Sequence, residues 1–273
     1  MSKAGMSNIL LTIAYDGSGF HGWQKQPSVR TVQGVIEEAL EKITGKTIQV
    51  EGTSRTDAGV HAVGQCATIR GDFGIPTERI SLAVNNLLYD ASILSAVEKP
   101  ENFHACTDAI GKTYIYRFAF APPGSAAVFL RHYACILKDK PNTGMMLEAA
   151  KYIWGTHDFA CFQASGGAPR ETTVRTIFGI EIRETKKNDI AGNPYEEIEI
   201  AVTGDGFLYN MVRIIAGTLA SVGFGKIRPE EIKDIISSKD RARAGATAPP
   251  QGLYLTKVYF DRASLMAYTR GDS

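Results

Sequence analysis

Arg55 and Asp57 place a guanidinium and a carboxylate two residues apart in the polar segment 52–62, which reads GTSRTDAGVHA. Polar loops held on a rigid scaffold are common places for binding and catalytic groups. A carboxylate can act as a nucleophile in glycosyl chemistry, stabilise a positively charged sugar or move a proton. Gly52 and Gly59 would allow backbone conformations that are closed to other residues. The segment therefore presents one carboxylate, Asp57, and one guanidinium, Arg55, and is a candidate binding or catalytic loop.

An ordinary hairpin loop would account for the same residues. Aspartate favours turns because its side chain hydrogen-bonds to nearby backbone groups. On composition alone, Asp57 would cap a turn and Arg55 would be solvated. The choice between the two interpretations therefore depends on the order of residues in the rest of the chain.

The elements that would position this loop can be predicted from hydrophobic patterning. Residues 46–51 and 63–69 read as strands on either side of the loop. Residues 8–15 are mostly apolar and predict a buried strand, while residues 31–44 carry apolar side chains at the spacing of one helical face. Thr31 is a suitable N-cap for that helix.

The rest of the chain continues this mixture of strands and helices. The predicted elements are a helix from residue 77, strands at 92–97 and 112–120, a helix at 145–153, strands at 173–183 and 195–202, helices at 207–222 and 229–238, and a strand at 253–260. This order predicts an α+β fold with antiparallel pairing.

The composition is that of a soluble globular protein. The 273 residues are 44% hydrophobic and 22% charged, and they can bury a substantial core as one large domain or two smaller ones. The net charge of +1 does not by itself indicate a nucleic-acid partner. A local basic stripe could still bind RNA, because affinity depends on the charges near the phosphates.

The cysteines give no support for a zinc or thioredoxin-like site, because they are widely spaced and include no Cys-x-x-Cys pair. No secretory signal is expected, since residues 1–8 are polar and the apolar run 9–14 is short. A cytoplasmic setting with reduced thiols follows as the default. No membrane span is expected either, because Arg213 lies near the middle of the apolar segment 207–224 and would cost about 2.5 to 3.5 kcal/mol to insert.

Residues 17–22 (GSGFHG) match the glycine pattern of a dinucleotide-binding loop. That fingerprint requires a helix to start at the third glycine and face the pyrophosphate. Here Pro27 would interrupt such a helix, and the helical pattern starts only at Thr31. The pattern is explained at least as well by a loop that contacts RNA backbone with Lys25, although a dinucleotide-dependent oxidoreductase stays an alternative to test.

The order of residues resembles that of a known family across nearly the whole chain. Residues 55–62 (RTDAGVHA) are similar, without a break, to the signature loop of the bacterial tRNA pseudouridine synthase A family. Further blocks resemble that family's motifs in the same order: Tyr15-Asp16-Gly17, Gly22-Trp23-Gln24 and Thr31-Val32-Gln33; Phe103-His104-Ala105 and residues 112–116 (KTYIY); residues 155–159 (GTHDF); Phe207-Leu208, Met211-Val212-Arg213 and Gly217-Thr218-Leu219; and Ala246-Thr247-Ala248-Pro249 with Gly252-Leu253. One departure is Cys106, where the family commonly has an arginine that would contact RNA backbone.

The resemblance implies two similar α+β domains with largely antiparallel sheets, joined side by side with the active-site cleft between them. We expect these domains at residues 1–108 and 109–273. The implied activity converts uridine to pseudouridine at positions 38, 39 and 40 of the tRNA anticodon stem-loop. It needs no metal and no cofactor, and the family acts as a homodimer.

The resemblance also implies roles for particular side chains. Asp57 would be the essential residue, and Arg213 would pair with its carboxylate and keep it ionised. Tyr114 would stack on the target uracil. Apart from these matched positions, we expect Arg55 to stabilise a nucleotide that has flipped out of its stem, and Leu253 to line the uracil pocket. The alternatives are a core aromatic for Tyr114 and solvated side chains for Arg213 and Arg55.

Three other classes of protein remain as alternatives for the whole chain. A non-catalytic RNA-binding module would bind RNA without turnover. A dinucleotide-dependent oxidoreductase would bind a nicotinamide cofactor. A carboxylate- or metal-dependent hydrolase would give a product that differs in mass from its substrate.

Overall fold

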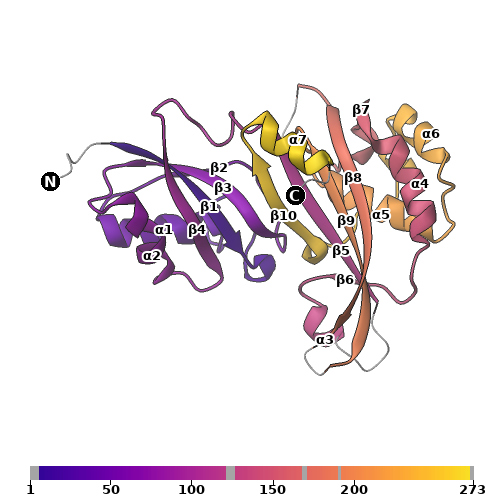
Figure 1. Cartoon of the computed structure of the whole chain (residues 1–273), viewed down its shortest axis with the longest axis horizontal. Helices are drawn as coiled ribbons and strands as arrows, with labels where there is room; N and C mark the ends of the chain where they lie inside the picture. The colour runs from indigo at the N-terminus through magenta and orange to yellow at the C-terminus, as the bar shows by residue number, and fades with distance from the viewer. Residues whose placement is uncertain (1–5, 121–126, 168–170, 190–191, 271–273) are drawn as a thin grey trace. The chain divides into compact units, whose positions relative to one another are not determined.

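The computed structural model describes residues 6–120, 127–167, 171–189 and 192–270 of the chain, which divides into two compact units (Figure 1). The first unit consists of Met1–Ile110 and Tyr254–Asp261, and the second of Gly111–Leu253 and Arg262–Ser273. The chain therefore returns to its first unit near the C-terminus. The expected functional domains at 1–108 and 109–273 stay a prediction.

The first unit is built on a sheet in which β4, β1, β3 and β10 are neighbours in that order. β1 (Ser7–Tyr15) pairs antiparallel with β3 (His61–Gly71) and with β4 (Ala91–Lys99). The short β2 (Val50–Gly52) pairs antiparallel with β3, while β10 (Leu253–Tyr259) runs parallel to it. β3 thus joins the strand before the Asp57 loop to the strand that returns from the second unit.

Two helices accompany this sheet, α1 (Val32–Thr44) and α2 (Thr77–Asn85), and they contact each other. The hydroxyl of Thr31 accepts a hydrogen bond from the backbone N–H of Gly34 at 3.3 Å and begins α1. Gly45 ends it in the left-handed conformation, at φ 67°. The predicted N-cap is therefore confirmed.

The second unit is built on a sheet in which β5, β9, β8 and β7 are neighbours. β5 (Gly111–Phe120) pairs antiparallel with β9 (Pro194–Gly204), which forms a long antiparallel hairpin with β8 (Val174–Asn188). β7 (Gly155–Asp158) pairs antiparallel with β8, and the short β6 (Cys135–Ile136) runs parallel to β5. Both sheets are thus largely antiparallel, and the predicted α+β fold class is confirmed.

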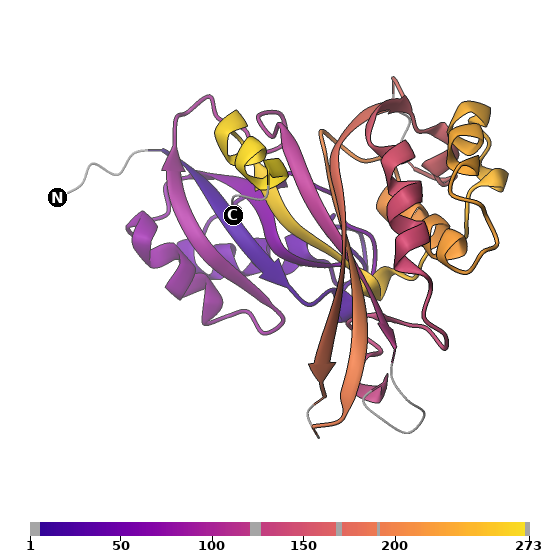
Figure 2. The same cartoon turned by 45° about the vertical axis from the view of Figure 1, so that its right-hand side comes forward.

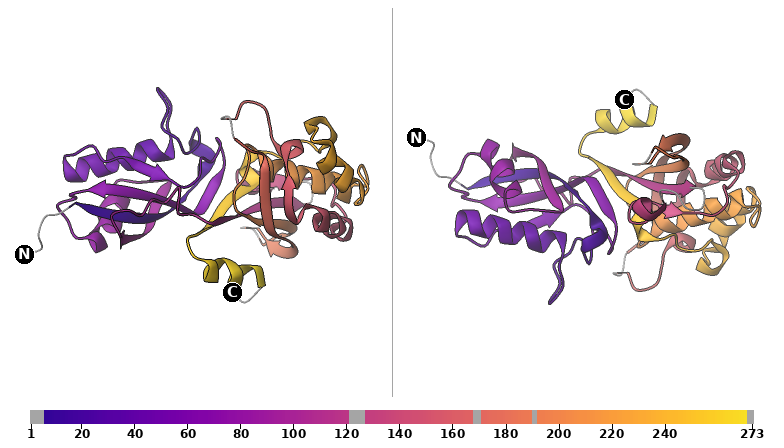
Figure 3. Two further views of the ribbon diagram at one scale, coloured as in Figure 1. Left: turned by 90° about the horizontal axis from the view of Figure 1, so that it is seen from above. Right: turned by 90° about the horizontal axis from the view of Figure 1, so that it is seen from below.

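Three helices of the second unit pack together, α4 (Thr143–Ile153), α5 (Met211–Gly223) and α6 (Glu231–Ser238), as Figures 2 and 3 show. α4 contacts both α5 and α6, and α5 also contacts β5. The remaining elements are α3 (Ala127–Leu130), α7 (Arg262–Arg270) and short 3-10 turns at Gly17–Gly19, Ala160–Phe162, Arg241–Arg243 and Pro250–Gly252. Within the four described ranges, no helix has the length and apolar character needed to cross a membrane.

A buried ion-pair network fixes the middle strand of the second sheet to its neighbours. The Glu197 carboxylate is fully buried and lies 2.6 Å from Arg117 Nε and 2.9 Å from Lys187 Nζ. Burial by itself raises the pKa of Glu197, but hydrogen bonds from Arg117 and Lys187 outweigh it and hold that pKa below its ordinary value. The network therefore keeps its charge at neutral pH and ties β9 to β5 and β8.

α5 begins later than the apolar pattern predicts. The expected helix started at residue 207, but Asn210 has a left-handed backbone (φ 60°) and α5 starts at Met211. Phe207 instead makes an edge-to-face contact with Tyr114, with ring centroids 5.2 Å apart. The segment 207–210 therefore connects the start of α5 to the aromatic side chains of β5.

Candidate active site

Residues 53–60 form the loop that carries Asp57, and buried hydrogen bonds hold its first end. The backbone N–H and the hydroxyl of Thr53 both donate to the carbonyl of Cys66, at 2.8 and 2.9 Å. The side-chain amide of Gln65, which is fully buried, donates to the carbonyl of Ser54 at 2.7 Å. Cys66 and Gln65 belong to β3, the strand that follows the loop, so these contacts anchor the loop to that strand.

Thr56, the residue before Asp57, is held on two sides. Its hydroxyl hydrogen-bonds to the hydroxyl of Tyr15 at 2.7 Å, and both groups are buried. Its carbonyl accepts a hydrogen bond from the backbone N–H of Trp23 at 3.1 Å. The Asp57 carbonyl then accepts from the N–H of Val60 at 3.2 Å and closes the turn. The backbone that carries the carboxylate is thus fixed by β1, by the loop that contains Trp23 and by a hydrogen bond within its own turn.

The loop presents its ionisable side chains and buries its hydroxyl groups. Arg55 is exposed and Asp57 is partly exposed, whereas Thr53, Ser54 and Thr56 are buried. Hydrogen bonds of the Thr53 and Thr56 hydroxyls hold these two residues inward, whereas the buried Ser54 hydroxyl has no hydrogen-bond partner among the described residues. Arg55 and Asp57 are therefore the ionisable groups that this loop presents for chemistry or binding.

The glycines of residues 17–22 pack against this loop. A Cβ at Gly17 would lie 2.1 Å from the Val60 carbonyl oxygen, and one at Gly22 would lie 2.7 Å from the Thr56 carbonyl oxygen. Gly22 also has φ +88°, and no helix begins there, since α1 starts at Val32. The close approach of the two backbones thus explains glycine at positions 17 and 22. In the described chain, the helix that a dinucleotide fingerprint requires does not begin at Gly22.

Glycine is required at Gly59 and at Gly52 for different reasons. Gly59 has φ +78°, as the sequence predicts for a turn that favours glycine. Gly52 does not need a positive φ. A Cβ at Gly52 would lie 2.4 Å from the ring of Trp23, so glycine leaves space for that buried indole. The expectation of an unusual backbone conformation at Gly52 is therefore wrong.

His61 closes the far end of the loop as a structural residue. Its Nδ1 accepts a hydrogen bond from the backbone N–H of Gly17 at 3.0 Å and lies 3.3 Å from a carboxylate oxygen of Asp16. Its ring stacks on Tyr254, with centroids 4.7 Å apart. His61 is buried between β10 and residues 16–23, which we call the opening loop. It positions the backbone next to the Asp57 loop.

Tyr114 and its neighbours on β5 form part of the second unit's aromatic core. Tyr114 is 8% exposed, while Tyr116 and Phe118 are almost completely buried. The Tyr116 hydroxyl donates to the carbonyl of Pro249 at 2.7 Å, and burial raises the pKa of this phenol above its usual range. Tyr116 and Phe118 are core residues, as predicted, and Tyr114 lies nearer the start of the same strand, against Phe207.

Arg213 lies in the first turn of α5, and its guanidinium has two acceptors from the second unit. Its Nε donates to the carbonyl of Ala248 at 2.7 Å, and its Nη1 donates to Oδ1 of Asn210 at 2.6 Å. The backbone carbonyl of Arg213 in turn accepts from the N–H of Ala248 at 3.1 Å. The side chain is partly exposed. A guanidinium has five N–H donors, so this arrangement can fix its plane and still bind an anion.

The segment 245–249, which supplies the Ala248 carbonyl, is seated closely on α5. A Cβ at Gly217 would lie 1.9 Å from the carbonyl oxygen of Ala246, so only glycine fits there. The N–H of Gly245 donates to the Thr218 hydroxyl at 2.9 Å. Leu253 follows this segment and is buried. Sequence reasoning missed Asn210 and the Ala248 carbonyl, although both lie inside or beside quoted motifs.

The predicted site residues thus fall on both units. Arg55 and Asp57 belong to the first unit, and Tyr114, Arg213 and Leu253 to the second. In the second unit, the segment 207–210 links Tyr114 to the start of α5, because Phe207 contacts Tyr114 and Asn210 contacts Arg213.

Among the described residues, no three His, Cys, Asp or Glu side chains gather where they could hold a metal ion. Cys66, Cys135 and Cys161 are buried free thiols, and Cys106 is an exposed one. Burial raises the pKa of Cys66 and of Cys161 to about 11, so these thiols stay protonated and unreactive at neutral pH.

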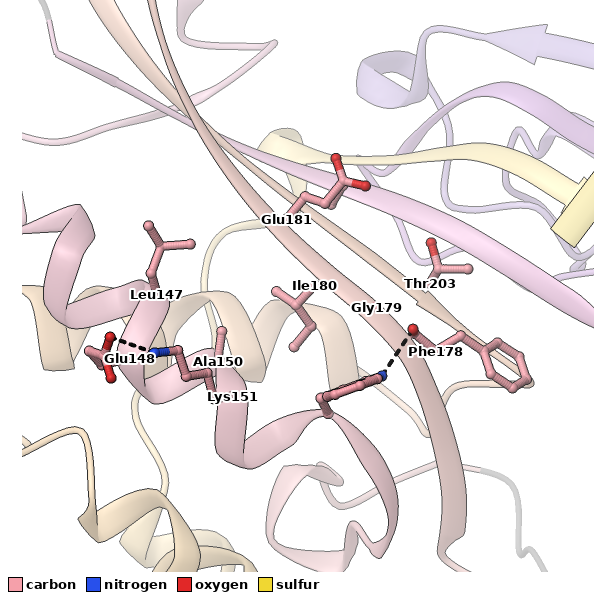
Figure 4. A pocket seen from close by; sticks show the side chains of 11 residues that line it. Leu147, Glu148, Ala150, Lys151, Phe178, Gly179, Ile180, Glu181 and Thr203 are labelled. Carbon is pink, nitrogen blue, oxygen red and sulfur yellow. Dashed lines mark hydrogen bonds and ion pairs between the residues drawn. The ribbon is translucent and has the colours of Figure 1, made fainter. Parts of the chain in front are cut away.

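A pocket of about 540 Å³ lies in the second unit between α4 and β8 (Figure 4). Leu147 and Lys151 line it from the helix, and Phe178 and Ile180 from the strand. The indole N–H of Trp154 donates to the Phe178 carbonyl at 3.0 Å, while 64% of this side chain stays exposed. Asp57, Tyr114, Arg213 and Leu253 are not among the lining residues.

Comparison with known proteins gives one consistent result. A family model described as tRNA pseudouridine synthase matches residues 11–108 and 149–261. The chain is 48% identical over 256 residues to tRNA pseudouridine synthase A of Ruminiclostridium cellulolyticum, covering 93% of this chain and 100% of that protein. It is 45% identical to tRNA pseudouridine synthase A 2 of Clostridium tetani (93% and 99% covered) and 44% identical to tRNA pseudouridine synthase A of Acetivibrio thermocellus (93% and 100% covered).

The contact between Gly22 and Thr56 gives a prediction about stability. Gly22→Ala should lower the free energy of unfolding by more than Gly74→Ala, as measured by urea denaturation. Both glycines have positive φ, so both substitutions strain the backbone by about 1 to 2 kcal/mol. A Cβ at Gly22 meets the Thr56 carbonyl at 2.7 Å, whereas nothing lies within 4 Å at Gly74. Equal losses would show that the opening loop does not support the Asp57 loop.

Proposed function

The chain belongs to the tRNA pseudouridine synthase family, and on that basis we propose that it isomerises uridine to pseudouridine at positions 38, 39 and 40 of the tRNA anticodon stem-loop. The observation that carries this proposal is the unbroken RTDAGVHA segment on an anchored loop, within a family match that spans most of the chain. The reaction breaks the bond between ribose C1′ and uracil N1 and forms one between C1′ and C5. The C5 proton leaves and N1 regains one, so substrate and product have equal mass.

Asp57 is the essential residue of this proposal. Its carboxylate can stabilise or attack the electron-poor sugar or base, and it can take up a proton. The contacts of Thr56 with Tyr15 and Trp23 support this role, because they fix the backbone next to the carboxylate. A reacting group held in one orientation loses little freedom on reaching the transition state.

Arg213 pairs with the Asp57 carboxylate in the working site. A nearby guanidinium lowers the pKa of a carboxyl group and keeps it ionised at neutral pH. Two observations support this pairing: the guanidinium is held by the neutral oxygens of Ala248 and Asn210, and it is partly exposed. Neutral acceptors orient the positive charge without cancelling it.

The remaining site residues bind the extruded nucleotide. A uridine in a paired stem must leave the stack before it can react, at a cost of a few kcal/mol. Tyr114 stacks on the free uracil, and Leu253 lines the pocket that holds it. Arg55, exposed on the loop, occupies the space that the nucleotide leaves and contacts phosphate. The isomerisation requires no coenzyme and no metal, and we place it in the cytoplasm.

The enzyme acts as a homodimer, and the face around the α4–β8 pocket supports a contact between two copies. Trp154 is 64% and Leu147 is 43% exposed, and both line the same pocket, so two apolar side chains are exposed next to each other on this face. In the described residues, β8 beyond residue 177 pairs with β9 alone, so its outer edge can receive another chain. Glu148 and Lys151 carry opposite charges on α4, and a two-fold axis that passes between them would place each opposite the unlike charge of the second copy.

Replacing Asp57 tests the proposed chemistry. Asp57→Asn should reduce pseudouridine formation in unmodified tRNA by at least about 10³-fold, because the carboxylate acts directly on the reacting nucleoside. Carbodiimide mapping measures the product and its position. Binding of tRNA should be kept, with its salt dependence, because phosphate contacts dominate affinity.

Asp72→Asn is the matched control, because Asp72 is an exposed loop carboxylate of the same unit that pairs with Lys46 at 2.9 Å. It should leave turnover unchanged. Activity in Asp57→Asn equal to that of the wild type would contradict the assigned role. RNA binding by the wild type without any product would favour the non-catalytic module, and product outside the anticodon arm would overturn the assigned positions.

The dimer contact gives a separate prediction. Trp154→Ala should raise the dimer dissociation constant by at least about tenfold, since an exposed tryptophan at the centre of a contact commonly dominates its energy. Sedimentation equilibrium over a range of protein concentrations measures the constant. Tyr89→Ala removes another exposed aromatic ring, from the first unit, and should have no effect. A monomeric wild type, or equal effects of the two substitutions, would refute this contact.

A further inference from the structure

We propose that Asn210 is a positioning residue for the isomerisation: its side-chain oxygen and the Ala248 carbonyl together hold the Arg213 guanidinium in the orientation needed at the Asp57 carboxylate. This inference rests on the proposed function. Asn210 stands at the start of α5, but its side chain makes no capping bond and its backbone is left-handed.

The side chain of Asn210 does not do what asparagine commonly does at the start of a helix. Asn210 is the N-cap of α5, where asparagine is favoured because its side chain can accept a hydrogen bond from the first backbone N–H groups. No such capping bond is formed. The side-chain oxygen instead accepts from Arg213 Nη1 at 2.6 Å. The residue thus serves the guanidinium in place of the helix terminus.

The backbone of Asn210 is adapted to this contact. It has φ 60° and ψ 9°, and it is one of three described non-glycine residues with positive φ, with Ser28 and Lys239. Asparagine and glycine tolerate this conformation better than other residues. The left-handed turn lets the chain leave Phe207, which packs on Tyr114, and enter α5 at Met211. One residue therefore connects the orientation of Arg213 to the segment that supports Tyr114.

Two acceptors on different nitrogens determine the plane of the guanidinium. Ala248 accepts from Nε at 2.7 Å and Asn210 from Nη1, so rotation about the end of the Arg213 side chain would break at least one bond. Ala248 is itself fixed, because its N–H donates to the Arg213 carbonyl. Both acceptors are uncharged, so these two hydrogen bonds orient the guanidinium without adding a counter-charge.

Asn210→Gly is the decisive variant, because glycine keeps the left-handed backbone and removes the acceptor. We expect the single-turnover rate of pseudouridine formation to fall by about 10- to 100-fold, since a small misplacement of a catalytic group has effects of this size. The dissociation constant for tRNA should stay within about twofold, because it is set by many phosphate contacts. Ser28→Gly, at the other left-handed position of a loop, is the matched control and should leave the rate unchanged.

Asn210→Asp separates positioning from charge. Aspartate also tolerates the left-handed backbone and offers an acceptor, but its negative charge competes for Arg213. The pKa of Asp57 should then rise toward that of an unpaired carboxyl, so the acidic limb of the pH–rate profile should move to higher pH in this variant. A residue that only shapes the backbone would not move that limb, and an unmoved limb would count against the proposal.

Side-chain ¹⁵N spectra of Arg213 test the positioning without relying on turnover. In the wild type the Nη signals should show restricted rotation, and in Asn210→Gly they should average. A wild type that makes no pseudouridine would overturn the proposed function, while these spectra would still decide whether Asn210 holds the guanidinium. Unchanged spectra, or a rate in Asn210→Gly equal to that of the wild type, would overturn the present inference alone.

Discussion

The anchorage of Thr56 is the constraint on which the proposed chemistry depends. Its hydroxyl meets Tyr15 inside the first unit, and its carbonyl meets the backbone of Trp23. Both contacts require the opening loop to approach closely, and the close approach in turn requires glycine at positions 17 and 22. In this protein, buried hydroxyl and backbone groups therefore fix the backbone that carries the Asp57 carboxylate.

In the second unit, the group that is held in place is the Arg213 guanidinium. Two neutral oxygens, the Ala248 carbonyl and Oδ1 of Asn210, accept hydrogen bonds from the Arg213 guanidinium and orient it. The segment that carries Ala248 is held on α5 by the contact of Gly217 with Ala246. Fixed backbone therefore supports the ionisable groups of both units, and neither group depends on a long flexible loop for its direction.

Local patterning was sufficient to predict most elements and the cap of α1, because these depend on residues near one another in sequence. The start of α5 was missed because Phe207 and Leu208 are apolar, and nothing local shows that Asn210 adopts a left-handed conformation. The reason for Gly52 was also missed, because the side chain that needs its space is Trp23. The groups that hold the site are likewise distant, such as Tyr15 and Thr56, which are 41 residues apart. The order of the motifs was what identified Asp57, Tyr114 and Arg213 as candidates.

The account's central claim is that Asp57 and Arg213 act as one ion pair, and a double-mutant cycle tests it most directly. The single-turnover rate of pseudouridine formation would be measured for the wild type, Asp57→Asn, Arg213→Gln and the double variant. If the two side chains work as a unit, the double variant should be little slower than the slower single variant, because the first change already breaks the pair. Losses that simply multiply would show that the two residues act independently and would contradict the account.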